Sequence, residues 1–206
     1  MNRFATCFAV LLSGALVLGP LALGVVTDDK KPATKQPTQE EMMAAMAKMG
    51  AVGENHKKLE QMSGEWKSDV KCWMDPQGEP MKSQGTSKNQ MILGGRFLAC
   101  EFNGEMMGQP YNGHHLMGFD NTKGKFFSIW IDNMNTGYMA ADGSPDASGK
   151  SLTFTSTYDC PVKKMPVKMR MVTTMIDNDT QKFEMFGSDA GGPEMKQMEI
   201  LSKRVK

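Results

Sequence analysis

Three histidines are the side chains best suited to acid and base chemistry: His56, His114 and His115. The last two lie in a strand-like run, and adjacent residues on a strand face opposite sides, so only one of them can point inward. His115 alternates in phase with Tyr111 and Met117, so we expect His115 to be the inward one. There it could serve as a general base, while a surface or hydrogen-bonded structural histidine is the competing interpretation.

The stretch WIDNMNTGYM, residues 130–139, is a second concentration of polar groups. A Trp, an Asp, two Asn and a Thr this close together fit either an active site or a turn. Asp, Asn and Gly are the residues whose side chains cap tight turns or whose backbones tolerate them. We therefore predict a turn between two strands, with Trp130, Asp132 and Tyr138 as contacts at the rim of a ligand pocket.

Charged residues also occur in the middle of strand-like runs, namely Glu101, Arg170 and Glu184. An inward Arg170 could hold a carboxylate or phosphate with its planar guanidinium. However, the run VKMRMVTT places Met169 and Met171 on the opposite face, and thioethers suit an interior lining better. An outward Arg170 paired with an acid is the preferred interpretation, and Glu101 is kept as a candidate ligand contact.

No standard catalytic motif is present: the sequence lacks GxSxG, HExxH, GxGxxG and a phosphate loop. It has no CxxC pair and no cysteine with a histidine at metal-ligand spacing, which removes the usual signal for zinc. The segment DGSPDASG resembles the start of a calcium loop only faintly, because it lacks the required Gly and Glu, and we interpret it as a hairpin turn.

A methionine stripe lies in the segment EEMMAAMAKMG, at residues 42, 43, 46 and 49. Clustered thioethers could bind Cu(I), since soft ligands select soft metals. No His or Cys accompanies the stripe, so apolar packing is the preferred interpretation. The sequence thus predicts neither a metal nor a cofactor.

Composition and the N-terminus restrict partners and location. Lys and Arg total 24 against 23 for Asp and Glu, so the basic surface that binds nucleic acid is missing. Residues 1–24 have one Arg followed by a long apolar run, which predicts a signal peptide and export to the periplasm or extracellular space. The alternative is an uncleaved N-terminal anchor with the rest facing outward. Cleavage would leave Cys72, Cys100 and Cys160, hence at most one intramolecular disulfide.

The remaining chain divides by composition into a linker, short helices and strands. Residues 25–37 are polar and contain two prolines, which predicts a disordered linker. Residues 38–50 predict a short Met-rich helix that begins with a capping box, and residues 53–64 predict a second helical piece. Strands are then predicted at 66–73, 83–93, 96–106, 109–119, 125–131, 137–141, 151–159, 167–176, 181–187 and 194–203.

Alternation of apolar and polar residues defines the fold class. KFFSIWID and SLTFTSTY both alternate with period two, and the breaks between the strands carry turn residues. Closure is the simplest way to remove the edges of so long a meander. We predict an all-β fold over residues 53–206, a roughly ten-stranded antiparallel up-and-down barrel preceded by one or two short helices and wide enough for a small ligand.

Gly64 and Trp66, directly after a short helix, resemble the Gly-x-Trp opening of the calycins, in which the Trp plugs the closed end of the barrel. Longer segments, including NQMILGGRFL, EFNGEMMGQPYNG and MGFDNTKGKFFSIWIDNMNTG, are similar to a bacterial family known as domain of unknown function 1579. The resemblance implies a calycin-like, lipocalin-like barrel, often exported, and supplies no catalytic residue. Haem-binding relatives of the calycins use a His near the C-terminus as the iron ligand. No His follows His115 in this chain, so the resemblance does not imply a similar haem site.

Three functional hypotheses follow. A binding module would hold a small apolar or amphipathic ligand, with Trp66, Glu101, His115, Trp130, Asp132 and Tyr138 as candidate contacts. An enzyme, a hydrolase or isomerase of a lipid-like or aromatic molecule, would need at least two acid or base groups to meet in one cavity. A structural envelope protein would have a filled barrel and an exposed apolar patch. The sequence does not specify the ligand or the oligomeric state.

Overall fold

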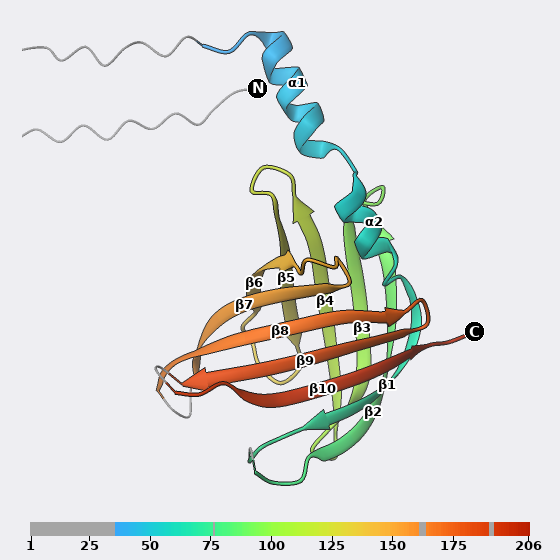
Figure 1. Cartoon of the computed structure of the whole chain (residues 1–206), viewed down its shortest axis with the longest axis vertical. Helices are drawn as coiled ribbons and strands as arrows, with labels where there is room; N and C mark the ends of the chain where they lie inside the picture. Colours follow the sequence, from blue (N-terminus) through green and yellow to red (C-terminus); the bar gives the residue numbers. More distant parts are fainter. Residues whose placement is uncertain (1–35, 76, 161–163, 190–191) are drawn as a thin grey trace, which may run out of the picture. The chain divides into compact units, whose positions relative to one another are not determined.

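The computed structural model describes residues 36–75, 77–160, 164–189 and 192–206. The predicted signal peptide and most of the predicted linker lie outside these residues. Two helices come first, α1 (Gln39–Gly50) and α2 (Glu54–Glu60), and ten strands follow (Figure 1). Among the described residues no helix has the length and apolar content needed to cross a membrane.

Both helices begin at local hydrogen bonds. Thr38 caps α1: its hydroxyl accepts from the backbone N–H of Glu41, and the Glu41 carboxylate accepts from the backbone N–H of Thr38. At α2 the ring Nδ1 of His56 accepts from the backbone N–H of Gly53 at 3.1 Å. His56 is buried and its ring packs edge-on against Phe119, so this histidine is a structural cap.

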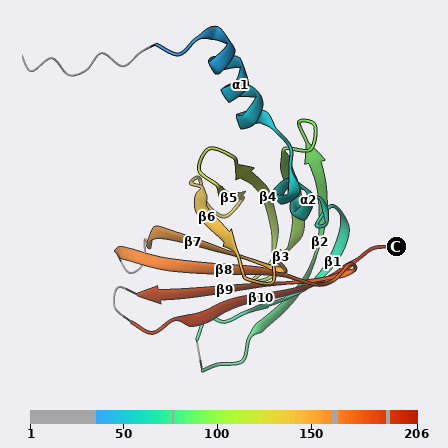
Figure 2. The same ribbon diagram turned by 45° about the horizontal axis from the view of Figure 1, so that its top comes forward.

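The ten strands close into one antiparallel barrel in which each strand pairs with its neighbours in sequence and β1 pairs with β10 (Figure 2). This confirms the predicted all-β up-and-down barrel, and each predicted strand is found. The strands are β1 (Gly64–Cys72), β2 (Met81–Ile92), β3 (Phe97–Met106), β4 (Gln109–Asp120), β5 (Lys125–Asp132), β6 (Met139–Pro145), β7 (Ser151–Cys160), β8 (Met165–Asp177), β9 (Thr180–Asp189) and β10 (Met195–Arg204).

The Gly-x-Trp segment closes one end of the barrel. Trp66 is fully buried, and its indole N–H donates to the carbonyl of Met62 at 3.1 Å. The guanidinium of Arg204, from the last strand, lies over the Trp66 ring at 4.2 Å and donates to the carbonyls of Ser63 and Gln61. Gly64 has φ +119°, and a side chain there would collide with Arg204, which gives the glycine of this motif its physical reason.

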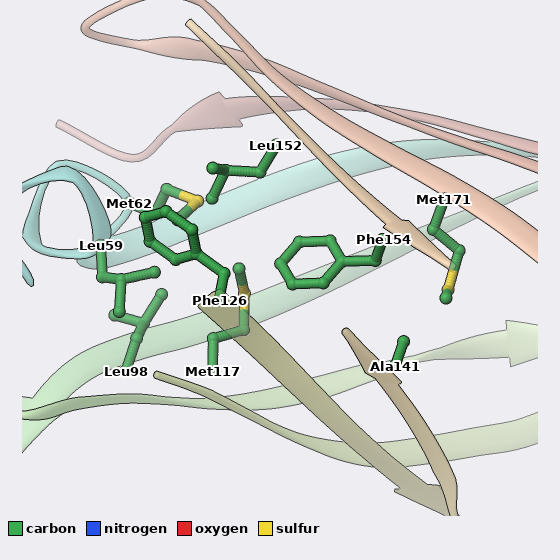
Figure 3. Close-up of a cluster of buried hydrophobic side chains, with 9 residues drawn as sticks. All are labelled: Leu59, Met62, Leu98, Met117, Phe126, Ala141, Leu152, Phe154 and Met171. Atoms are coloured by element: carbon green, nitrogen blue, oxygen red, sulfur yellow. The ribbon is translucent and has the colours of Figure 1, made fainter. Parts of the chain in front are cut away.

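Apolar side chains fill the barrel next to this closed end. α2 lies against β2, β3 and β4 (Figure 1). Figure 3 shows Phe126 between Met62 and Phe154, with the other side chains around them. The cluster consists of Leu59, Met62, Leu98, Met117, Phe126, Ala141, Leu152, Phe154 and Met171.

Charged residues in mid-strand point outward. Arg170 forms a bidentate ion pair with Glu194 and lies over the Phe186 ring at 4.1 Å, as the preferred interpretation expected. Glu184 binds Lys196 on the outer surface. Glu101 is exposed, and the residues next to it, Cys100 and Phe102, are the ones that face inward. None of the three charged side chains is inside the barrel, where each would have needed a charged partner.

The Met-rich helix α1 buries no side chain. Its Met42, Met43, Met46 and Met49 are each about half exposed or more. The amide of Asn121 holds the end of the helix by donating to the carbonyls of residues 48, 49 and 51. The expectation that the stripe packs on the barrel is therefore wrong.

Candidate functional site

The barrel interior differs between its two ends. Beside α2 the inward side chains are buried, as Trp66 and Phe126 at 0% exposure show. Toward the other end, along the arc from β1 to β6, inward side chains remain partly exposed. These are Cys72, Ser83, Ser87, Cys100, Phe102, Tyr111, His115, Trp130, Asp132 and Met139. Solvent therefore reaches the interior from this end, which we call the mouth.

Three aromatic rings line the mouth on adjacent strands: Phe102 from β3, Tyr111 from β4 and Trp130 from β5. Their centroids are 6.1 to 6.5 Å apart, and the Tyr111 and Trp130 planes lie within 28° of each other. Together they form a continuous surface, which we call the aromatic wall. On the opposite side of the ring order, β8 contributes the inward thioethers of Met169 and Met171.

Glycines make room for the aromatic wall. The Trp130 ring lies over Gly113, where a Cβ atom would overlap the indole. The Phe102 ring lies over Gly85 and Gly104 in the same way. One face of each ring therefore packs on backbone, and the other face is directed into the barrel.

Asp132 fixes two of the three rings. Its Oδ2 accepts from the Trp130 indole N–H at 2.8 Å and from the Tyr111 hydroxyl at 3.1 Å. The buried environment and the nearby carboxylate raise the pKa of Tyr111, so the phenol stays neutral and remains a donor. Hydrogen bonds to a carboxylate are stronger than those between neutral groups, so the wall is held in one arrangement.

The same carboxylate organises the following turn. Asp132 Oδ1 accepts from the backbone N–H of Met134 at 2.9 Å and from the Asn135 side chain at 3.1 Å. Asn135 accepts from the N–H of Gly137, and Asn133 bonds to the neighbouring β4 segment. The WIDNMNTGYM segment is thus the predicted turn, and its first and third residues are at the same time part of the mouth.

His115 lies deeper, between the aromatic wall and the core. It points inward, as its phase predicted, with its ring 5.9 Å from that of Trp130. Its Nε2 shares a hydrogen bond of 2.7 Å with the hydroxyl of Ser128. Burial lowers the pKa of His115 to about 4, so the imidazole is neutral at physiological pH.

Two thiols near the aromatic wall, those of Cys72 and Cys100, are poor nucleophiles. Cys100 is the strand partner of His115, and burial raises its pKa to about 11. Burial also raises the pKa of Cys72. Because the thiolate is the reactive form, neither residue is activated for covalent chemistry or metal binding. Among the described residues no group of three His, Cys, Asp or Glu side chains is arranged to hold a metal ion.

The predicted contact residues separate into three places. His115, Trp130 and Asp132 come together at the mouth. Trp66 is at the closed end, and Tyr138 is 73% exposed in the turn. Glu101 lies outside, beside His114, in an outer-face hollow of about 400 Å³ over β2 to β5.

Sequence reasoning did not select Tyr111, Phe102 or Ser128 as site residues. The period-two phase could have identified two of them, because Tyr111 lies on the same strand face as His115, and Ser128 lies on the same strand face as Trp130. Phe102 could have been found from the glycines, since Gly85 and Gly104 interrupt two strands where a ring lies across the backbone.

Comparison with known proteins identifies the family. Residues 51–204 match the family model described as protein of unknown function (DUF1579), so the chain belongs to this family. No curated protein matches the sequence.

Solved structures match this chain at low sequence identity, and the one from M. tuberculosis shares the fold. Rv2717c from M. tuberculosis is 12% identical with a TM-score of 0.55, covering 76% of this chain and all of that one. A redesigned β-barrel is 14% identical, with a TM-score of 0.40 and coverage of 72% and 96%. EF1p2_mFAP2b bound to DFHBI is also 14% identical, with a TM-score of 0.40 and coverage of 73% and 98%.

Proposed function

We propose that this DUF1579 protein is an exported binding protein that holds a small apolar or amphipathic ligand in the mouth half of its barrel. The observation that carries the proposal is the aromatic wall, whose inward faces remain partly exposed although the closed half of the barrel is filled. Maintaining such a surface open to water costs free energy, and binding sites are the usual reason for it.

The interior suits an apolar ligand body. Phe102, Tyr111 and Trp130 supply flat faces, and Met169, which is outside the filled core cluster, supplies a flexible thioether on the opposite side. Flat rings fixed by Asp132 lose little conformational entropy on binding, and methionines adapt to the ligand's shape.

A fluorescent apolar probe tests the proposal. N-Phenyl-1-naphthylamine is titrated into the protein purified after expression of the full chain, and saturable one-to-one binding with micromolar affinity is expected. Trp130→Ala should weaken binding about tenfold, because removing one stacking face costs about 1–3 kcal/mol. Tyr138→Ala is the matched control, since Tyr138 is exposed outside the wall, and should bind normally. A probe signal that never saturates would refute the proposal.

The enzyme hypothesis has one specific observation in its favour, the Ser128–His115 hydrogen bond. A serine paired with a histidine is the arrangement of a nucleophile and its base. Here Asp132 binds Trp130 and Tyr111, and the low pKa of His115 makes the imidazole a weak base. Ester hydrolysis lost in both Ser128→Ala and His115→Gln variants would favour the enzyme, and binding without turnover favours the carrier.

Export rests on the pattern of residues 1–24 and is tested independently of the ligand. The full chain is expressed with its own N-terminus, and the intact mass of the exported protein is measured. Loss of about the first 24 residues is expected. A membrane-bound product of full mass would instead support the N-terminal anchor.

A further inference from the structure

The mouth contains one negatively charged side chain, that of Asp132. Among the described residues, no positively charged side chain faces inward beside it. Among the described side chains that face inward, Asp132 and Arg204 are the charged ones. Arg204 is at the closed end, stacked on Trp66. Asp132 therefore stands alone at the mouth, and it takes part in none of the described ion pairs.

Neutral groups satisfy the hydrogen bonding of Asp132 without cancelling its charge. Both oxygens accept from two donors each: Trp130 and Tyr111 on Oδ2, Met134 and Asn135 on Oδ1. No favourable lone-pair direction is left for a ligand N–H group. A cation that needs no hydrogen bond, in contrast, gains the full electrostatic attraction of the carboxylate.

The aromatic wall provides the second element of cation recognition. Phe102 is tilted by 63° to Tyr111 and by 59° to Trp130, so the three rings form a corner with negative π faces directed inward. Aromatic faces attract cations that are already poorly hydrated, and quaternary ammonium groups are the best example. Beside a carboxylate, such a corner favours a cation over a neutral group of the same size.

The rim beside the aromatic wall adds charge of the same sign. Strands β1 to β6 are consecutive in the ring, so their connections at the mouth border the aromatic wall. Among the described residues of these connections, Asp75 and Glu79 are the charged ones. Across the barrel the β7–β8 connection carries Lys164, so the attraction for a cation is confined to the side of the rim next to the wall.

We propose that the mouth binds a quaternary ammonium headgroup, with the attached apolar chain entering the methionine-lined interior. The proposal rests on the proposed binding function and narrows its ligand class to cationic amphiphiles. It assigns Asp132 and the aromatic wall to the headgroup, and Met169, which lies outside the filled core cluster, to the chain.

Four amphiphiles with the same dodecyl chain test the charge preference: dodecyltrimethylammonium, dodecylammonium, dodecanol and dodecanoate. Each is titrated below its micellar concentration by calorimetry, with the protein purified after expression of the full chain. Dodecyltrimethylammonium should bind about tenfold tighter than dodecanol, because the desolvated aromatic faces and the carboxylate attract only the cation. Dodecylammonium should bind more weakly than the trimethyl compound, and dodecanoate most weakly.

Two variants locate the preference. Asp132→Asn keeps a hydrogen-bond acceptor for the wall but removes the charge. It should weaken the binding of dodecyltrimethylammonium about tenfold and leave the affinity for dodecanol unchanged. Phe102→Leu keeps the apolar volume but removes one π face, and it should weaken the binding of dodecyltrimethylammonium about threefold. If Asp132→Asn does not fold, the Phe102→Leu variant and the affinities of the wild-type protein for the four amphiphiles still test the preference for a quaternary ammonium group.

Each result has one meaning. Equal affinity for dodecyltrimethylammonium and dodecanol overturns the cation proposal but leaves the binding function standing. Equal affinity for dodecylammonium overturns the preference for a headgroup without N–H donors. Tightest binding of dodecanoate overturns the charge argument altogether. Failure of all four to bind overturns the proposed function together with this inference.

Discussion

Among single residues, His115 and Trp130 show what holds the side chains of the mouth in place. Desolvation inside the barrel lowers the pKa of His115 and keeps its imidazole neutral, so its hydrogen bond to Ser128 is between uncharged groups. Trp130 has its position because Gly113 leaves space beneath the ring. Both features give predictions that do not require the ligand.

The stability of the protein should fall as pH is lowered between about 6.5 and about 4. The pKa of His115 is about 4 in the folded state and about 6.5 when unfolded, so the unfolded chain binds more protons in this window. The contribution is fully present above pH 6.5 and reaches about 3 kcal/mol. Urea unfolding of the wild type and His115→Gln at several pH values measures it. A wild-type slope that survives in His115→Gln would contradict the assignment.

Gly113→Ala should destabilise the protein by about 1–3 kcal/mol, because the new methyl group overlaps the Trp130 ring. The displaced indole should also lose its bond to Asp132, which near-ultraviolet circular dichroism and tryptophan emission would detect. Gly53→Ala is the control, since a Cβ there meets nothing within 4 Å. An unchanged Trp130 spectrum in Gly113→Ala would show that the ring has room to move aside.

At the scale of elements, the two helices differ in what they contribute to the fold. Leu59 of α2 is fully buried in the core cluster, whereas α1 buries nothing. The capping box of α1 is complete, so local sequence signals are enough to define this helix.

Leu59→Ala should therefore cost about 2–5 kcal/mol of unfolding free energy. Met46→Ala in α1 should change it by less than about 0.5 kcal/mol, because its side chain is 64% exposed. Chemical denaturation of the two variants side by side provides the measurement. A large loss in Met46→Ala would mean that α1 packs against something in solution.

Strands and turns could be predicted well from the sequence because their signals are local. Period-two alternation correctly predicted that Met169, Met171 and His115 point inward. The ring contacts of Phe102 with Tyr111 and Trp130 could not be predicted, because they depend on the register between strands. The outward position of Glu101 was missed because an isolated charge in a strand does not show which face is buried.

At the scale of the whole molecule, the first and last strands hold the barrel closed. Register pairs along β1 and β10 run from Trp66 with Arg204 to Cys72 with Met198, and a buried hydrogen bond of 2.8 Å joins Ser68 to Ser202. This ring leaves no open sheet edge, which protects the protein from edge-to-edge aggregation.

A circular permutant should fold. Because Val205 donates to the carbonyl of Glu65, the C-terminus can be joined to Gly53 by a flexible linker that spans α2, about 10 Å long. New termini in the exposed turn at residues 146–149 leave every strand intact, so a cooperative melt is expected. A chain that stops at Asp189 lacks β10, exposes the edges of β1 and β9, and should aggregate. A permutant that behaves like this truncated chain would contradict the prediction.

Asp132 both holds the turn after β5 and orients two rings of the aromatic wall, which restricts how the sequence can change in evolution. The turn after β5 and the orientation of two rings depend on one carboxylate, so neither can drift by mutation without the other. A homologue that inserts residues into this turn would have to recruit another anion or rebuild its mouth. The arrangement of the aromatic wall should therefore vary with the length of this turn among homologues, and a change at Asp132 should alter both together.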